Sequence, residues 1–432
     1  MSTIQETLLD HLYGSPTAYQ AVARLKEKLD SQGFMELYQN QSWDLKPGQN
    51  YYVSANGSSL LAWRMPKDKA TGFSIIAAHL DSPCFKVKPN GEIYTRNVVE
   101  LNTQPYGGAI WSSWFDRPLH LAGRVMVKKD GSVIAVPMVV QATPLVIPNP
   151  AIHMNREANN GVKLDAQRHL LPVLGLSNQR LPLLRVLLAK ELKVKPDDIL
   201  AHDLYLINRQ KGEVWGVNKE MLSSPRLDDQ ACAWLGYEAF TQSESSENIP
   251  VLACFDNEEV GSATRQGAAS TFLFDTLSEI AAAVGGSVRK LFANSLFLSC
   301  DNGHAAHPNY PEFDDPTNSA NLNEGILIKH NARTSYTTDG LSWALFAQIC
   351  EMAEVKTQHY TNRSNIMGGG TLAQISLTQV SMPALDIGLP QWAMHSSYET
   401  CGALDIASML KAMTAFYCTK RSLSEDSWVL KS

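Results

Sequence analysis

Histidines and carboxylates follow several apolar runs of this chain, and their types and spacing could support metal-dependent chemistry. The residues are His79 and Asp81 after FSIIAA, Asp256, Glu258 and Glu259 after VLACF, Asp301, His304 and His307 after SLFLSC, His395 after ALDIGLPQWAM, and Asp228 and Asp229 in SPRLDDQ. Mixed histidine and carboxylate ligands suit Zn²⁺, Mn²⁺ or Co²⁺. The sequence has no paired CxxC motifs, which argues against a structural zinc knuckle.

The spacing within two of these segments has a physical meaning. Residues two apart on a strand point to the same side, so His79 can bind a metal while Asp81 orients a histidine ligand through a hydrogen bond. The side chains of Glu258 and Glu259 diverge, so one can bind metal while the other acts as a general base on a water molecule beside it. Any one of these residues alone is as well explained by a surface position or a helix N-terminus. It is the coincidence of five segments that indicates a site.

The apolar runs predict strands, and the segments between them predict helices. FSIIAAH (73–79) is apolar on both faces, as a central parallel strand requires. Further strands are expected at 51–55, 60–65, 251–255, 295–300, 326–330 and 384–388, and helices at 230–240, 274–284, 341–353, 371–377 and 403–416. This alternation predicts an α/β layered fold. Because ligands bind at the carboxyl ends of strands in such sheets, the candidate residues should meet there.

Residues 92–222 differ in character, with few acids and several turn signals. Residues 129–132 (KDGS) separate GRVMV from VIAVPMVV and predict a β-hairpin. Residues 181–192 predict a helix, and Lys211-Gly212 predicts a second hairpin. We therefore expect one α/β domain, made of residues 1–91 and 223–432, that is interrupted by an inserted β-rich domain at 92–222.

The first thirty residues predict helical structure. Ser15 is a suitable N-cap, Pro16 fits the first helical position, and Gly33 is expected to end the helix. This N-terminal segment carries Glu6 and Asp10, unlike a signal peptide.

Composition narrows the possible function classes. The chain has 432 residues, 37 Lys and Arg, 43 Asp and Glu, and a net charge of −6, so bulk attraction to nucleic acid is not expected. No apolar run approaches the ~18–20 residues of a membrane span. The seven cysteines are an odd number and several lie in apolar runs, which indicates buried, reduced thiols. We expect a cytoplasmic protein with neither a nucleic-acid nor a membrane partner.

The longer motifs around these residues resemble one family. HLDSPCFKVKP (79–89), SPRLDDQ (224–230), FDNEEVGS (255–262), SCDNGHAAHPNY (299–310) and LPQWAMHSSYET (389–400) resemble the M18 metallo-aminopeptidases, the aspartyl aminopeptidase family, in the family's order across nearly the whole chain. The resemblance implies a di-zinc exopeptidase-type proteolytic domain, with a mixed, mostly parallel sheet flanked by helices. In this family an inserted domain serves dimerisation, which fits residues 92–222.

The resemblance also implies roles for single residues. His79 and Asp301 would hold one Zn²⁺, Glu259 and His395 would hold the other, and Asp228 would bridge the two. Glu258 would be the general base and Asp81 an orienting acid. His153 in NPAIHMNRE would reach the active site of a neighbouring subunit, and His304, Lys329 and Tyr336 match substrate-pocket positions.

The expected activity is removal of the N-terminal residue from peptides, with a preference for Asp and Glu that Lys329 would confer. Asn365 stands where the family more often has Asp, so a preference for neutral residues such as Leu stays open. Mn²⁺ or Co²⁺ could replace Zn²⁺. The resemblance further implies dimers that assemble into a tetrahedral dodecamer. The alternatives are a related di-metal amidohydrolase acting on N-acyl amino acids and a non-catalytic scaffold.

Overall fold

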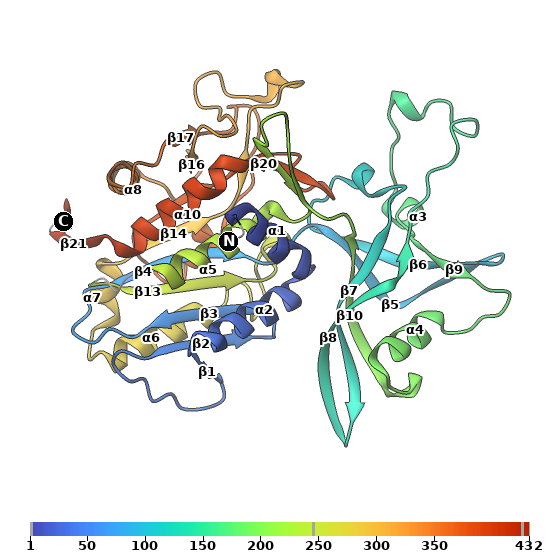
Figure 1. The fold of residues 1–432 in the computed structure, drawn as a ribbon, viewed down its shortest axis with the longest axis horizontal. Coiled ribbons are helices and arrows are strands. Elements are labelled where there is room, and N and C mark those ends of the chain that lie inside the picture. Colours follow the sequence, from blue (N-terminus) through green and yellow to red (C-terminus); the bar gives the residue numbers. More distant parts are fainter. Residues whose placement is uncertain (1–2, 244–246, 425–426, 432) are drawn as a thin grey trace. The chain divides into compact units, whose positions relative to one another are not determined.

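The chain divides into two compact units in the computed structural model, which describes residues 3–243, 247–424 and 427–431 (Figure 1). The first unit comprises the described residues of Met1–Asp81, Gly212–Met394 and Glu399–Ser432, and the second comprises Ser82–Lys211 and His395–Tyr398. The boundaries expected from the sequence, 91/92 and 222/223, lie further along the chain. The difference at the first boundary arises because β5 (Cys84–Thr95) pairs with β6 (Val98–Tyr106) inside the second unit.

A nine-stranded mixed sheet forms the centre of the first unit among the described residues. Its order is β1 (Met35–Leu37), β2 (Asn50–Ala55), β3 (Ser59–Arg64), β13 (Ile249–Phe255), β4 (Phe73–His79), β14 (Leu296–Cys300), β18 (Ala384–Gly388), β16 (Ile326–Lys329) and β17 (Thr357–Tyr360). The neighbours β13, β4, β14 and β18 run parallel to one another, whereas β3 and β16 are antiparallel to β13 and β18. The expected mixed, mostly parallel sheet is confirmed.

Helices cover both faces of this sheet, and alternate strand residues point to each face. Ile76 and Ala78 of β4 belong to the core under one group of helices, and Ile75 and Ala77 belong to the core under the other. The first group is α1 (Ile4–Gly14), α2 (Ala18–Ser31), α5 (Leu227–Gln242), α8 (Gly340–Met352) and α10 (Ala403–Cys418). The second group is α6 (Phe272–Ala283), α7 (Val288–Ala293) and α9 (Leu372–Ser376).

A smaller sheet and a hairpin complete the first unit. The five short strands of the sheet are β11 (Glu213–Trp215), β12 (Met221–Ser224), β20 (Glu399–Gly402), β19 (Pro390–Trp392) and β15 (Gly303–His304), in that order. The hairpin pairs β21 (Lys420–Ser424) with β22 (Ser427–Lys431). Strands this short carry too little periodicity to be predicted, and the sequence did not indicate the smaller sheet.

The second unit is built on a six-stranded antiparallel sheet. Its order is β8 (Ser132–Leu145), β7 (Leu119–Lys129), β10 (Ile199–Asn208), β5, β6 and β9 (Val173–Leu176), with α3 (Ala166–His169) and α4 (Leu183–Leu192) beside it. The predicted hairpin is confirmed, because β7 and β8 pair across Asp130 and Gly131, both of which have positive φ. Such φ values are typical of the tight turns that join two strands.

Two local predictions are wrong. The residue that caps α2 is Thr17 rather than Ser15, so Pro16 lies before the helix and not in its first turn. Lys211-Gly212 does not close a hairpin: β10 pairs with β7 and β5, β11 pairs with β12, and the chain passes between the two units at this dipeptide. Both errors arise because turn residues mark a change of direction without showing which strands or helices follow it.

Two expectations about the chain as a whole can be compared with the described residues. Each helix described is too short or too polar to cross a lipid bilayer. All seven cysteines are free thiols, and six of them are buried, with Cys418 exposed.

Candidate active site

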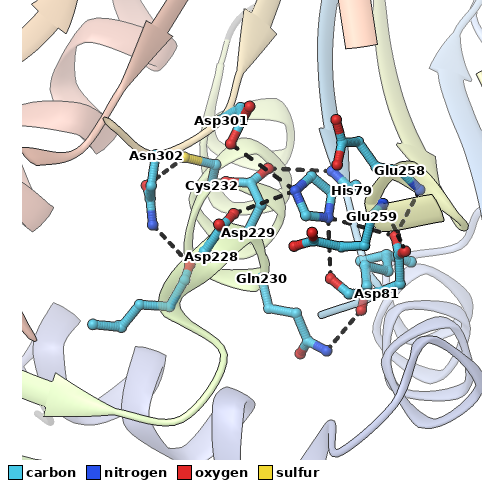
Figure 2. A network of polar contacts seen from close by, with 12 residues as sticks. His79, Asp81, Asp228, Asp229, Gln230, Cys232, Glu258, Glu259, Asp301 and Asn302 are labelled. Atoms are coloured by element: carbon cyan, nitrogen blue, oxygen red, sulfur yellow. Dashed lines mark hydrogen bonds and ion pairs between the residues drawn. The ribbon is translucent and has the colours of Figure 1, made fainter. Parts of the chain in front are cut away.

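Carboxylates from several segments meet at His79 in the first unit (Figure 2). Three neighbouring parallel strands, β13, β4 and β14, end at this point. Glu258 and Glu259 follow β13, Asp81 follows β4, and Asp301 follows β14. The expectation that these residues gather at the carboxyl ends of the strands therefore agrees with the structure.

His79 is buried and has a contact at each ring nitrogen. Its Nδ1 lies 3.0 Å from the backbone carbonyl oxygen of Asp81. Because a carbonyl only accepts hydrogen bonds, Nδ1 carries a proton, and Nε2 is the nitrogen that could bind a metal ion once its own proton is displaced. Nε2 lies 3.3 Å from Oδ1 of Asp228 and 4.0 Å from Oδ1 of Asp301.

Asp81 fixes the loop that carries the two glutamates. Its Oδ1 accepts a hydrogen bond from the backbone N–H of Glu258, and its Oδ2 accepts one from that of Glu259, both at 3.2 Å. The same carboxylate lies 3.5 Å from Nδ1 of His79, which is bound more closely by the carbonyl group of Asp81. Asp81 thus orients the glutamate loop with its side chain and His79 mainly with its backbone.

The two aspartates of SPRLDDQ enter the site from the start of α5. Both have non-helical backbone angles, so the regular helix begins after them. The backbone N–H of Asp228 donates to Oε2 of Glu399 at 3.0 Å, and Oδ2 of Asp229 accepts the backbone N–H of His79 at 3.2 Å. Asp228 therefore presents its carboxylate to the His79 ring, while Asp229 holds the backbone of His79.

The electrostatics of the cluster favour an added positive charge. Burial raises the pKa of Asp229 and of Asp301, and neighbouring carboxylates raise both further. Burial also raises the pKa of Glu258 to about 7, although His79 opposes the shift. Burial alone would lower the pKa of His79, yet hydrogen bonds to Asp228 and Asp81 raise it well above its usual value. A cation bound among these carboxyl groups would offset their mutual repulsion and favour their ionised forms.

The donor set fits a divalent metal ion. The ligand atoms of His79, Asp228 and Asp301 all lie within 4.8 Å of one another, and so do those of His79, Glu258 and Glu259. Imidazole nitrogen and carboxylate oxygen are ligands that Zn²⁺ accepts. The residues present therefore fit at least one divalent ion.

Lys329 lies behind Asp301 and is also buried. Its ammonium group donates to the backbone carbonyl of Asn302 at 2.9 Å and lies 3.4 Å from Oδ2 of Asp301. The ring of Tyr336 faces it, with the Nζ atom 5.1 Å from the ring centroid. Burial alone would lower the pKa of Lys329, but Asp301, Tyr336 and Asp386 raise it above its usual value. The lysine is therefore a fixed positive charge.

Of the other predicted residues, His304 belongs to the first unit, whereas His153 and His395 belong to the second. His304 is an exposed residue of β15, with its ring centroid 6.0 Å from that of Tyr360. His153 lies in an exposed segment of the second unit. His395 also groups with the second unit, where its Nδ1 lies 3.2 Å from the carbonyl oxygen of Gly108.

Sequence reasoning gave no role to Asp229 and missed Asn302, and both make buried hydrogen bonds at the site. Asn302 donates to the carbonyl oxygen of Leu227 at 2.9 Å and to Oε1 of Gln391 at 2.8 Å. Its own Oδ1 accepts from the Cys232 thiol at 3.2 Å. An Asn directly after Asp301 and an Asp directly after Asp228 were visible signals, since a polar residue beside a buried ligand must itself find partners.

Comparison with known proteins decides the family. The profile of the family described as "Aminopeptidase I zinc metalloprotease (M18)" matches residues 11–417. The chain belongs to the M18 family. It is accordingly a metallo-aminopeptidase, as its motifs indicated.

Individual M18 relatives resemble the chain over nearly its full length. A "Probable M18 family aminopeptidase 2" from Clostridium novyi is 41% identical over 422 residues, which is 95% of this chain and 97% of the relative. The protein solved in "Cryo-EM structure of the Ape4 and Nbr1 complex" is 33% identical with a TM-score of 0.93, covering 96% of this chain and 85% of that one. A yeast mApe1 solved as a dodecamer is 26% identical with a TM-score of 0.84, covering 96% of each chain.

Proposed function

We propose that this M18 enzyme removes the N-terminal residue from peptides by means of two bound Zn²⁺ ions, and that it prefers Asp or Glu at that position. The observation that carries the proposal is the cluster of potential metal ligands around His79, in which Asp81 holds the backbone of Glu258. Mn²⁺ or Co²⁺ could take the place of Zn²⁺, because the same nitrogen and oxygen donors suit all three ions.

Each ion is assigned its own ligands. His79 and Asp301 would hold one ion, Glu259 and His395 would hold the other, and Asp228 would supply a ligand to both. The assignment of His395 is supported by its ring contacts: Nδ1 faces the Gly108 carbonyl, so Nε2 is the nitrogen that could bind a metal ion. The chain also places His395 only four residues before Glu399, which accepts the backbone N–H of Asp228.

Glu258 is assigned the proton transfers. When bound, the ions supply Lewis acidity and lower the pKa of water. Glu258 accepts the proton of the attacking water molecule and passes it to the leaving amine. Asp81 keeps this carboxylate in place through the backbone of the glutamate loop. His153 of a neighbouring subunit is the proposed donor to the developing oxyanion.

The acidic preference rests on Lys329. A buried ammonium group in the pocket would be left without a full complement of hydrogen bonds when a neutral side chain binds, whereas a substrate carboxylate could accept from it. Tyr336 and His304 are assigned to the same pocket. One N–H of the ammonium group is bound to the Asn302 carbonyl and another faces Asp301 at 3.4 Å, so the third N–H would be the donor to the substrate.

Assembly into dimers, and from these into a tetrahedral dodecamer, is part of the proposal. A related mApe1 has been solved as a dodecamer. In the second unit, Met154 is 81% exposed and Ile152 is 48% exposed, on either side of His153. Apolar side chains at such exposure favour burial against a second copy of the chain. We further place the enzyme in the cytoplasm.

A substrate panel with and without chelator tests the proposal. Aminoacyl substrates with Asp, Glu and Leu should be cleaved, acidic ones fastest, and a chelator should abolish cleavage until Zn²⁺, Mn²⁺ or Co²⁺ is restored. Cleavage of N-acetyl amino acids alone would instead indicate the amidohydrolase, and a metal-loaded protein inactive on every substrate would indicate a scaffold. Light scattering should show a particle far larger than a monomer; an active monomer would contradict both the assembly and the role of His153.

A further inference from the structure

Asp386 is a buried carboxylate that the proposed mechanism does not use. It lies in β18, in the apolar sequence ALDIG, and none of its surface is exposed. Such a group requires hydrogen-bond donors, because an unpartnered buried carboxylate is costly. Its neighbours therefore indicate what it does.

Its partners come from two loops. Oδ2 accepts the backbone N–H of Thr337 at 2.6 Å and the hydroxyl of the same residue at 2.8 Å. Oδ1 accepts the hydroxyl of Thr371 at 2.5 Å. The backbone N–H of Asp386 donates to the hydroxyl oxygen of Thr338 at 2.9 Å. One residue thus fixes the loop after β16 and the end of the glycine run 368–370.

Thr371 shows that this arrangement is favoured over a local alternative. It is the N-cap residue of α9, where a threonine hydroxyl normally accepts a backbone N–H of the first helical turn. It makes no such capping bond, and its hydroxyl donates to Asp386 instead. The hydroxyl group is therefore oriented toward Asp386 and not toward the first turn of the helix.

Asp386 is also placed beside the pocket lysine. In the antiparallel pairing of β16 and β18, Lys329 and Asp386 are directly opposed, and opposed residues point to the same face of a sheet. The two charged groups form no ion pair of their own, since the carboxylate is engaged by the threonines. Tyr336 directly precedes Thr337, and its ring faces the ammonium group of Lys329.

We propose that Asp386 is a positioning residue that holds Tyr336 against Lys329, and so sets the selectivity of the pocket for acidic N-terminal residues. The proposal rests on the proposed function, in which Lys329 and Tyr336 line the substrate pocket. When the carboxylate is removed, the 334–338 loop loses the two bonds of Thr337 to β18 and keeps only that of Thr338 to the backbone N–H of Asp386. Tyr336 then no longer confines the ammonium group to one position, and the substrate carboxylate meets a mobile partner.

The test compares the selectivity ratio, kcat/KM for an Asp substrate divided by kcat/KM for a Leu substrate, in wild type and Asp386→Asn. We expect the ratio to fall by about tenfold in the variant, mainly through a higher KM for the Asp substrate, with zinc content unchanged. Thr337→Val and Thr371→Val, which keep the side-chain shape and remove one donor each, should lower it by about threefold. They decide the question if Asp386→Asn fails to fold.

Asp405→Asn is the matched control. Asp405 is likewise a buried carboxylate, 1% exposed, and accepts the backbone N–H groups of Asn323 at 2.6 Å and Gly325 at 3.0 Å, just before β16 begins. The control should lower Tm while leaving the selectivity ratio unchanged. If Asp386→Asn behaves in the same way, with a lower Tm and an unchanged ratio, Asp386 is structural only and the proposal is wrong.

The same substitution made in a Lys329→Met enzyme distinguishes failure of this proposal from failure of the proposed acidic preference. If Asp386 acts through Lys329, Asp386→Asn should not change the ratio further in a Lys329→Met enzyme. An equal change in both backgrounds would overturn the proposal. A wild type that favours Leu would refute the acidic preference alone, and the positioning role would then be decided by whether Asp386→Asn shifts the ratio only when Lys329 is present.

Discussion

Replacement of Glu258 by Gln is the sharpest test of the assigned chemistry. Glutamine has the shape of glutamate but cannot accept a proton at neutral pH. The backbone N–H of Glu258 is held by Asp81 at 3.2 Å, and this bond does not involve the altered side chain. The loop should therefore keep its place, and the two ligands His79 and Glu259 should still bind metal.

The size of the effect follows from the role of a positioned general base. Burial raises the pKa of Glu258 to about 7, and a cation bound beside the carboxyl group would lower it. Loss of a positioned general base lowers a rate by about 10²–10⁴-fold. This equals about 2.7–5.4 kcal/mol in the activation barrier. Glu258→Asp keeps the base but withdraws it by one methylene group, so we expect a loss of about 10²-fold from misplacement alone.

The assay measures kcat under saturating substrate together with metal content in the same protein sample. We expect kcat to decrease from wild type through Glu258→Asp to Glu258→Gln, with two ions per chain and Tm within the wild-type range in all three. If Glu258→Gln retains kcat within about threefold at full metal content, Glu258 is not the base. A loss of metal would instead make it a ligand.

Three further predictions concern the neighbours of this residue and the fold. Asp228→Asn should lose metal, measured by elemental analysis, because one carboxylate serves two ions; two retained ions per chain would contradict the bridge. Asp81→Asn places an amide N–H against one of the two backbone N–H groups of Glu258 and Glu259, which should displace the loop and lower kcat by about 10–100-fold. A lower Tm with an unchanged kcat would show that Asp81 only stabilises the loop. His11 is buried, stacks on Trp234 at 4.4 Å, and burial followed by the charges of Arg24, Lys28 and Arg226 lowers its pKa to about 3. The unfolded chain therefore binds an extra proton between about pH 6.5 and pH 3, so this histidine should lower the free energy of unfolding by about 2 kcal/mol from pH 7 to pH 5. His11→Phe should remove that part of the pH dependence, whereas the control His169→Phe, at an exposed position, should not. Equal slopes of unfolding free energy against pH in wild type and His11→Phe would show the reasoning to be wrong.

The strands of the central sheet and the acids that follow them could be predicted because both depend on local sequence. Runs such as FSIIAAH and ALDIG give the strands at 73–79 and 384–388 with the observed bounds. The acids at their ends could be placed at one edge of a sheet by a general rule for parallel strands. That β13, β4 and β14 are neighbours is a property of the fold, and the sequence order of the strands does not contain it.

The detailed geometry of the site depends on pairings between distant segments. Asp81 was expected to orient a histidine with its carboxylate, but in the structure this carboxylate lies mainly against the glutamate loop, 177 and 178 residues away along the chain. Lys329 was expected only to face a substrate, yet its ammonium group lies against Asp301 and Asn302. Contacts of this kind arise when strands meet side by side, so spacing within one motif does not reveal them.

Asp386 was nevertheless marked in the sequence, because it is the one acid within the apolar run ALDIG. A carboxylate inside a strand that is buried on both faces must find hydrogen-bond donors when the chain folds, because its removal from water costs free energy. Residues that break the local pattern in this way are expected at functional or structurally important positions. The threonines that supply the donors occur as a pair in SYTTDG and after glycines in GGGTL, just before or at the start of the predicted helices at 341–353 and 371–377. A buried acid in one strand therefore requires hydroxyl donors from other segments, and which threonines supply them is decided only when the strands and loops come together.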